Sequence, residues 1–528
     1  MTNSIPDIEE AACILITGSN TSEGHPLIGS RVFKAKERGA KIIVIEPRMI
    51  QLAHHADIYL RQRPGTDVAW INGMMNVILA NGWESKDFIA SRTEGFDTLR
   101  DKVKEFPPEK VEQITGIPKA DLVKAAEMFA KSGKSAILYA MGITQHISGT
   151  DNVLSLANLA MLTGNIGRKG TGVNPLRGQN NVQGACDMGG LPNVFTGYQN
   201  VTDEAARKKF EEAWGVKLPP QNGITLMEMM HGAAEGKIKG LFVLGENPML
   251  SDPDTKHVKE ALGKLELLVV QEIFQSETTA MATVVLPGAS WAEKDGTFTN
   301  TDRRVQLIRK AVQPPGEARA DWQIICDIGK KMGGKGFDFA SPSAVFDEMA
   351  KLTPICAGIN YERLGKTVSG LQWPCRTPED PGTEVLHTSA FSRGKGLFSA
   401  IDFREPAELP DAQYPLTLTT GRSIFHYHTG TVTRNSPTLE SELHEAYIEV
   451  NPEDAGSIGV GDDDMVKVAS RRGEITLKVR ATDRVGKGVV FMPFHFAEAA
   501  ANMLTNTALD PVAKIPELKV CAVRMEKA

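Results

Sequence analysis

The chain has 528 residues, with 59 basic and 65 acidic side chains and a net charge of -6. A chain of this length corresponds to about three or four domains. Its acidic balance argues against nucleic acid or an anionic membrane surface as the main partner. No apolar run approaches the ~20 residues that span a bilayer, so we expect no membrane span.

The first third of the chain alternates strand-like and helix-like patterns. Buried parallel strands are indicated by continuous apolar runs that end in Gly, Asn or acidic residues. These strands are expected at residues 12–17, 41–45, 57–60 and 135–139, with helices at 26–38 and 67–79. Asp67 is expected to cap the second helix. This alternation predicts right-handed βαβ units and a parallel sheet.

The pattern recurs further along the chain. Strands are expected at residues 240–244, 267–270 and 283–286. The sequence ILITGSNT, which ends at Thr21, and FVLGENP, which ends at Pro248, both place a Gly-x-Asn turn after an apolar strand. The turns at Gly18 and Gly245 therefore indicate two related α/β halves, which would bind two similar ligands or two halves of one ligand.

Beyond about residue 383, helical patterns become scarce. Short strands are expected at residues 416–420, 446–450, 464–469, 473–479 and 488–492. Turn residues separate them, which is typical of a smaller β-rich, barrel-like domain. We predict α/β domains at 1–179 and 180–383, each doubly wound with a mostly parallel sheet, and a C-terminal β-barrel at 384–528.

Six cysteines occur in the chain, and none stands in C-x-x-C spacing. They indicate reduced thiols in a cytoplasmic protein rather than a disulfide scaffold, a zinc ribbon or a ferredoxin-type cluster. Cys13 lies in a buried-strand pattern and is expected in the core. The N-terminus lacks the basic and apolar regions of a signal peptide.

Ligands of open α/β sheets bind beyond the carboxyl ends of the strands. In the first half those ends carry Gly18–Asn20, Glu46–Arg48, Gly65–Asp67 and Met141-Gly142; in the second half they carry Gly245–Asn247 and Gln271–Phe274. Each loop alone is compatible with a plain turn, but two matching sets favour function. Neither half contains G-x-G-x-x-G, which disfavours ordinary NAD binding.

A glycine- and amide-rich segment joins the two halves, from Gly164 to Gly190, with Arg177 inside it. An arginine in such a loop can grip a small carboxylate with two hydrogen bonds. An irregular linker is the alternative, and the segment's length and low charge favour a ligand-lining loop. In the C-terminal part, His426 and His428 could suggest a metal pair, but no third ligand stands at a convincing spacing.

These residues resemble one family. The motifs SRTEGFD (91–97), LAMLTGNIG (159–167), TGVNPLRGQNNVQGACDMG (171–189), LGENP (244–248), ADWQII (320–325) and CAVR (521–524) are similar to those of molybdenum/tungsten bis-pterin oxidoreductases. The resemblance covers essentially the whole chain. The NPLRGQNNVQGACDMG block resembles the formate dehydrogenase branch in particular, specifically the catalytic alpha subunit.

The resemblance implies two molybdopterin guanine dinucleotides whose dithiolene sulfurs hold Mo or W, and a double-psi β-barrel that closes over them. The residues it implies near the cofactor are Asn20, Glu46, Arg48, Gly65, Asp67, Met141 and Gln145 for one nucleotide and its pterin side, Asn247, Gln271 and Asp321 for the other, and Arg422, His426, Tyr427, His428, Phe494, Asn502 and Lys519 from the barrel. Arg177 is the implied catalytic residue, which would orient formate beside the metal.

The chain also departs from the family pattern. Longer relatives carry a [4Fe-4S] domain and a selenocysteine or cysteine followed by histidine upstream of the region matched here. No cysteine precedes Cys13 and no histidine precedes His25. Cys186 does not match the metal ligand, so no metal-ligating residue is assigned in this chain.

Two hypotheses follow. In the first, the chain is the C-terminal portion of a formate dehydrogenase that oxidises formate or reduces CO2, truncated at a selenocysteine codon and inactive alone. Its partners would be the N-terminal remainder and electron-transfer Fe–S, hydrogenase or diaphorase subunits. In the second, the chain is a split or stand-alone subunit that binds cofactor or scaffolds a redox complex without catalysis.

Overall fold

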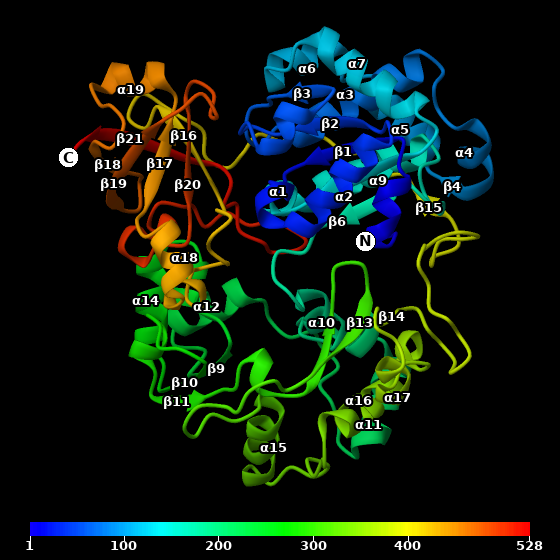
Figure 1. Cartoon of the computed structure of the whole chain (residues 1–528), viewed down its shortest axis with the longest axis vertical. Helices are drawn as coiled ribbons and strands as arrows, with labels where there is room; N and C mark the ends of the chain where they lie inside the picture. The colour runs from blue at the N-terminus through cyan, green and yellow to red at the C-terminus, as the bar shows by residue number, and fades with distance from the viewer. The chain divides into compact units, whose positions relative to one another are not determined.

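The computed structural model describes all residues from 1 to 528. The chain divides into two compact units (Figure 1). The first comprises residues 1–178, 250–256 and 385–528, and the second comprises 179–249 and 257–384. The first unit thus holds the α/β fold of the N-terminal part together with the barrel. The division into three domains stays a prediction.

The first unit contains a five-stranded parallel sheet in the order β3-β2-β1-β5-β6. Its strands are β1 (Cys13–Thr17), β2 (Lys41–Ile45), β3 (Ile58–Leu60), β5 (Ser135–Tyr139) and β6 (Gly172–Pro175). Its helices are α1 (Thr21–Gly24), α2 (Pro26–Glu37), α3 (Asp67–Ala80), α4 (Lys86–Arg92), α5 (Phe96–Val103), α6 (Pro108–Thr115), α7 (Lys119–Lys131), α8 (Met141–Thr144) and α9 (Gly149–Leu162).

Both faces of this sheet are buried, which explains the continuous apolar runs of its strands. Leu15 and its neighbours on one face pack against α3, α7 and α9. Ile14 and Ile16 on the other face pack with α2 and the 3₁₀ turn Ile5–Glu10. Successive strand residues point to opposite faces, so every residue of β1 is buried, including Cys13 as predicted.

The C-terminal part forms a closed six-stranded barrel in the order β16-β20-β17-β19-β18-β21. Its elements are β16 (Leu416–Gly421), α18 (Pro437–Glu442), β17 (Tyr447–Val450), α19 (Pro452–Ile458), β18 (Met465–Ala469), β19 (Glu474–Ala481), β20 (Val489–Pro493) and β21 (Cys521–Lys527). A short parallel pair, β4 (Thr93–Glu94) and β15 (Gly396–Leu397), ties the preceding segment to α4 and α5. Closure leaves the barrel without an open edge.

The second unit contains a three-stranded parallel sheet in the order β11-β10-β9 and an antiparallel sheet in the order β12-β13-β14. Its strands are β7 (Val194–Phe195), β8 (Gln199–Asn200), β9 (Gly240–Leu244), β10 (Leu267–Glu272), β11 (Val284–Pro287), β12 (Gly296–Thr299), β13 (Arg304–Ile308) and β14 (Leu371–Gln372). Its helices are α10 (Val182–Asp187), α11 (Glu204–Trp214), α12 (Leu226–Ala234), α15 (Asp321–Lys331), α16 (Pro342–Leu352) and α17 (Tyr361–Gly365); α13 (Pro248–Ser251) and α14 (Thr255–Gly263) each include residues of both units.

The two parallel sheets share their strand order where they correspond. The order β3-β2-β1 in the first sheet matches β11-β10-β9 in the second, and a glycine with left-handed φ directly follows both β1 and β9, Gly18 (φ 56°) and Gly245 (φ 63°). The predicted duplication therefore has a structural counterpart. The fold class is confirmed as α/β units with parallel sheets plus a C-terminal barrel.

One local prediction is wrong. Asp67 is not the cap of its helix, because the helix begins at Asp67 itself and Thr66 occupies the capping position. The Asp67 carboxylate instead accepts from the indole Nε1 of Trp70 at 3.2 Å, inside the fold. None of the helices is both long enough and apolar enough to cross a membrane.

Candidate functional site

Two carboxylates lie beyond the strand ends of the first sheet. Glu46 follows β2 and accepts a hydrogen bond from the Ser19 amide at 3.2 Å. Burial and the nearby Asp67 raise the pKa of Glu46 to about 7, against the opposing charge of Lys519. Burial likewise raises the pKa of Asp67. Two acids with raised pKa values at one sheet edge are poised to accept hydrogen bonds from a polar ligand.

A group of cations lies on the barrel side of the same unit. Lys519 is only 9% exposed, and its Nζ donates to the Thr420 carbonyl at 2.8 Å. Burial and the charge of Arg422 lower the pKa of Lys519 to about 8. Arg422 donates to the Gly178 carbonyl at 2.6 Å, and burial lowers its pKa too. Neither cation has a carboxylate within ion-pair distance.

Arg177 belongs to the same neighbourhood. It immediately precedes Gly178, whose carbonyl holds Arg422. Its charge acts on Tyr139 at the end of β5, partly opposing the burial that raises the pKa of Tyr139 to about 12. The structure therefore brings Arg177, Arg422 and Lys519 together around the end of the first sheet.

The loop that follows β16 carries four of the residues predicted to bind the cofactor, Arg422, His426, Tyr427 and His428. The Arg422 guanidinium lies 5.7 Å from the ring centre of Tyr427. The ring of His428 meets that of Phe494 edge-on at 5.8 Å. His426 is buried, with Nε2 2.6 Å from the Leu443 carbonyl and Nδ1 3.2 Å from the Thr433 hydroxyl. Both of its ring nitrogens are used within the barrel.

Two other predicted residues make strong contacts inside the first unit. Arg48 forms a two-point ion pair with Glu449 of β17, at 2.6 and 2.7 Å, and stacks on Phe491 at 4.0 Å. Asn502 donates to the carbonyls of Leu250 and Ser251 at 2.8 and 2.9 Å. Arg48 thereby fastens the sheet to the barrel. The predicted cofactor roles of Arg48 and Asn502 stay predictions.

Four further predicted residues lie at strand ends of the first sheet. The Nδ2 of Asn20 is buried and has no hydrogen-bond partner in the protein. Gly65 has φ 79°, and a Cβ there would come within 2.4 Å of the Pro406 ring. Met141 is exposed at 36% and accepts from the Thr144 hydroxyl through its sulfur, while Gln145 is partly buried.

The second unit carries its own cluster at the ends of β10 and β11. Gln271 donates to Asp321 Oδ1 at 2.6 Å, and Lys294 forms an ion pair with the same carboxylate. The Oε1 of Gln271 is buried without a partner. Asn247 accepts from the Thr278 hydroxyl and donates to Glu277, both at 2.7 Å. Gln271 and Asp321 are thus brought together, whereas Asn247 contacts Glu277 and Thr278.

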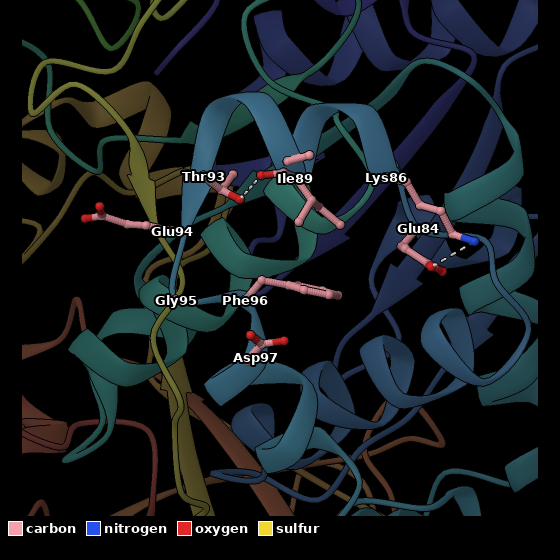
Figure 2. Close-up of a pocket in the computed structure, with 9 residues that line it drawn as sticks. Glu84, Lys86, Ile89, Thr93, Glu94, Gly95, Phe96 and Asp97 are labelled. Carbon is pink, nitrogen blue, oxygen red and sulfur yellow. Dashed lines mark hydrogen bonds and ion pairs between the residues drawn. The ribbon is translucent and has the colours of Figure 1, made fainter.

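A surface pocket of about 380 Å³ lies elsewhere in the first unit (Figure 2). Residues 93–97 of the SRTEGFD motif form part of its wall. The residues that line it are Glu84, Lys86, Ile89, Ala90, Thr93, Glu94, Gly95, Phe96 and Asp97. Figure 2 shows the carboxylates of Glu94 and Asp97 and the Glu84–Lys86 pair spread around it, with Thr93 bonded back to the Ile89 carbonyl. None of the predicted site residues lines this pocket.

Two residues near the predicted site were not assigned an individual role from the sequence. His495 bonds to both the Ser423 amide and the His428 carbonyl. Gly142 packs directly on Gly18, so that a Cβ at Gly142 would lie 2.6 Å from the Gly18 Cα. Gly142 follows β5 in the printed sequence and His495 follows β20, but no sequence pattern indicated the residues that they contact. Elsewhere, no three His, Cys, Asp or Glu side chains are grouped to hold a metal ion.

Comparisons with known proteins agree with this arrangement. The molybdopterin oxidoreductase family model matches residues 1–331, and the molybdopterin dinucleotide-binding domain model matches residues 416–522. The F420-dependent formate dehydrogenase subunit alpha of Methanocaldococcus jannaschii is 55% identical over 530 residues, which are 100% of this chain and 78% of the relative. Formate dehydrogenase H of Escherichia coli is 40% identical over 532 residues, covering 100% of this chain and 74% of the relative.

A solved structure shows the same fold. Acetylene hydratase from Pelobacter acetylenicus superposes with a TM-score of 0.76 at 20% identity, covering 99% of this chain and 81% of that chain. At this identity the likeness concerns the fold alone. The two family models match both parts of the chain. This chain therefore belongs to the molybdopterin oxidoreductase family, and its C-terminal barrel is a molybdopterin dinucleotide-binding domain.

Proposed function

We propose that this chain is part of the catalytic subunit of a formate dehydrogenase, which oxidises formate to CO2 or runs the reverse reaction. The observation that carries the proposal is the identity of 55% to a formate dehydrogenase alpha subunit across the entire chain. The Arg177 segment, with its motif of the formate dehydrogenase branch, lies at the cation group of the first unit. Both features point to a small carboxylate as the substrate.

The residues present fit a bis-molybdopterin guanine dinucleotide cofactor with Mo or W. Buried cations without a carboxylate partner, Arg422 and Lys519, suit an anion such as a pyrophosphate. Asn20, Gln271 and Ser423 each have a buried polar atom that forms no hydrogen bond within the protein. A bound cofactor could supply the partner that such atoms need. These atoms occur in both units, as expected if each unit contacts one nucleotide.

Specific roles follow from the donor types. Carboxylates at Glu46, Asp67 and Asp321 can accept from ribose hydroxyls or from the N–H groups of guanine. Lys519 and Arg422 neutralise the negative charge of the cofactor. The other predicted contacts at Asn20, Asn247 and Gln271 supply amide groups that can both donate and accept.

Formate oxidation breaks one C–H bond and yields CO2, one proton and two electrons. The bound metal cofactor supplies the acceptor for the electron pair. Arg177 would hold the two carboxylate oxygens of formate with two N–H donors, and this grip would orient the C–H bond for transfer of its electron pair to the bound cofactor. Its fixed charge also binds formate, which is an anion, in preference to neutral small molecules.

Further parts of the enzyme are proposed to lie outside these 528 residues. They are the amino-acid ligand of the metal and the [4Fe-4S] cluster, which we assign to the part of the relatives that this chain does not match, since it covers 78% of one formate dehydrogenase alpha subunit. Electrons would pass through the cluster to an Fe–S, hydrogenase or diaphorase partner subunit. The names of the relatives at 51–55% identity favour F420 as the final acceptor. Formate-dependent reduction of F420 against viologen by the assembled enzyme tests this choice.

Cofactor content and activity test the function. The chain is purified from a host that makes the cofactor, and Mo, W and guanine nucleotide are measured per chain beside formate-dependent viologen reduction. We expect little activity from these residues alone and robust activity once the N-terminal part is co-expressed. Absence of guanine nucleotide would contradict the proposal. Bound cofactor without formate activity in the co-expressed enzyme would favour a non-catalytic scaffold subunit.

Arg177 is tested in the co-expressed enzyme. Arg177→Lys keeps the charge but loses the two-point grip, so we expect kcat/KM for formate to fall about 100-fold, equivalent to about 2.7 kcal/mol. Cofactor content should be unchanged. Arg168→Lys is the matched control, because Arg168 is exposed and donates to the carbonyls of Gly133 and Gly164. Equal effects of the two variants would remove Arg177 from the site.

A further inference from the structure

The loop that carries Arg422, Tyr427 and His428 is held from outside by one histidine. His495 follows β20, and its Nε2 lies 2.9 Å from the Ser423 backbone nitrogen. Its Nδ1 contacts the carbonyl oxygen of His428. The imidazole therefore bridges the two ends of the segment from Ser423 to His428. His495 itself is fully buried.

The chemistry of the two partners fixes the state of the ring. A backbone amide can only donate, so Nε2 must be the unprotonated acceptor. A carbonyl can only accept, so Nδ1 must carry the proton. The ring is therefore neutral, in the Nδ1–H form. Burial lowers the pKa of His495 to about 3, and the neighbouring Arg422, His426 and His428 disfavour a further charge.

The bridge holds a conformation that the loop does not favour by itself. His428 has φ 50°, in the left-handed region that residues other than glycine rarely adopt. Its carbonyl is the one that His495 captures. A buried donor aimed at that carbonyl stabilises the backbone there, because turning the carbonyl away would leave both groups without a partner.

A second histidine holds the middle of the loop. The Nε2 of His426 donates to the Leu443 carbonyl at 2.6 Å, and its Nδ1 lies 3.2 Å from the Thr433 hydroxyl. The Thr433 hydroxyl oxygen in turn accepts from the Tyr427 amide at 3.1 Å. The backbone of the loop is thus held at Ser423 and His428 by His495 and at Tyr427 by Thr433.

We propose that His495 is a positioning residue that holds the 422–428 loop so that Arg422, Tyr427 and His428 are presented to the cofactor. The proposal rests on the function proposed above, which supplies the ligand. His495 itself acts through the backbone of Ser423 and His428, so it need not touch the cofactor. His426 has the supporting role in the middle of the same loop.

Two substitutions separate the halves of the bridge. The amide of His495→Asn places its nitrogen where Nδ1 lies, which keeps the donor to His428 and loses the acceptor for Ser423. The longer His495→Gln places its oxygen where Nε2 lies, which keeps the acceptor for Ser423 and weakens the donor to His428. His495→Phe fills the space and removes both. His444→Gln is the control, because His444 is exposed.

The first measurements use the purified chain without formate. Hydrogen exchange should show the Ser423 amide protected in the native chain and in His495→Gln, and exchanging at least ten times faster in His495→Asn and His495→Phe. Nitrogen-15 NMR should show His495 in the Nδ1–H form. An Nε2–H form, or Ser423 protection that survives in His495→Phe, would overturn the proposal.

The second measurement is cofactor retention. Guanine nucleotide per co-expressed chain should fall about tenfold in His495→Phe, with a smaller loss in His495→Asn and His495→Gln and none in His444→Gln. Circular dichroism identifies any variant that fails to fold. If His495→Phe does not fold, cofactor retention in His495→Asn and His495→Gln tests the proposal instead. Unchanged retention in a folded His495→Phe would contradict the proposal. If the native protein held cofactor but lacked formate activity, only the proposed reaction would fail.

Discussion

The two parallel sheets of this protein share a strand order but not their environment. Every residue of β1 is buried, and helices cover both faces of the first sheet. In the second sheet, one face packs on α12 and α14, whereas Phe242 and Leu244 of β9 and Val284 of β11 are 42–45% exposed on this chain. The same strand-and-turn pattern can therefore occur in a sheet that is covered on both faces or in a sheet with exposed apolar side chains.

The strand ends differ in the same sense. At the first sheet, Glu46 lies near Lys519 without forming an ion pair, and Arg422 is likewise without an acid. At the second sheet, the cation Lys294 is already paired with Asp321. The first end therefore presents cations that form no ion pair within the chain, and the second presents a cation that is already paired. Similar loops thus provide different electrostatics.

The largest effect is expected where the first sheet meets the barrel. Glu449→Gln leaves the buried Arg48 charge without its carboxylate, so we expect a loss of about 3–5 kcal/mol in the free energy of unfolding. The matching stretch of the second sheet, Gln271–Phe274, has no arginine. Urea titration measures the loss, with the exposed pair variant Glu453→Gln as the control at under about 0.5 kcal/mol. Equal losses would show that Arg48 does not fasten the barrel.

Two leucine-to-alanine substitutions, one in β1 and one in β9, compare how much burial in each sheet contributes to the free energy of unfolding. Leu15→Ala in β1 should cost about 3 kcal/mol, because Leu15 is fully buried in a two-sided core. Leu244→Ala in β9 should cost under about 1 kcal/mol, because Leu244 is 44% exposed. Hydrogen exchange resolved by strand measures each loss in its own sheet. A Leu244→Ala cost as large as that of Leu15→Ala would mean that the second sheet is covered in solution.

The raised pKa of Glu46 predicts a pH dependence of the protein without cofactor. The folded pKa is about 7 and the unfolded value is about 4.5, so the folded state holds the proton more tightly. The stability that Glu46 contributes is present below pH 4.5 and is lost as the pH rises through 7. Glu46→Gln should remove this dependence and stabilise the chain above pH 7 by at most about 3 kcal/mol.

Thermal unfolding between pH 5 and 8 measures this difference. Glu272→Gln at the end of the second sheet serves as the comparison, since burial also raises the pKa of Glu272 but without a large shift. If Glu46→Gln and Glu272→Gln changed the profile equally, the two strand ends would be electrostatically alike.

The smallest effect concerns ligand charge. Lys519→Met should weaken binding of guanosine diphosphate, the probe for the nucleotide half of the cofactor, about tenfold, or about 1.4 kcal/mol. Native affinity should fall as the pH rises above 8, because Lys519 then loses the proton that attracts the anion. Lys294→Met should have a weaker effect, since Lys294 is already paired. Calorimetry at pH 7 and 9 measures both, and a pH-independent native affinity would exclude Lys519.

Much of the fold could be predicted from the sequence because it depends on local pattern. The apolar run at 12–17 and the alternation after residue 383 indicated a doubly buried strand and a barrel, and both are present. The turns at Gly18 and Gly245 revealed the duplication because only a left-handed residue suits them. The cap assigned to Asp67 failed, since a carboxylate near a helix start has the same local pattern whether it caps the helix or turns inward to Trp70.

For the candidate site, too, some features could be predicted from local sequence and others could not. The sequence by itself determined which residue types stand at the strand ends, and therefore the family and the class of ligand. Only the tertiary structure decided how those residues are used: Arg48 pairs with Glu449 about 400 positions away, and His495 bridges the ends of a loop about 70 positions earlier. The physical reason is that burial and hydrogen-bond partners arise from long-range packing, which no local pattern encodes.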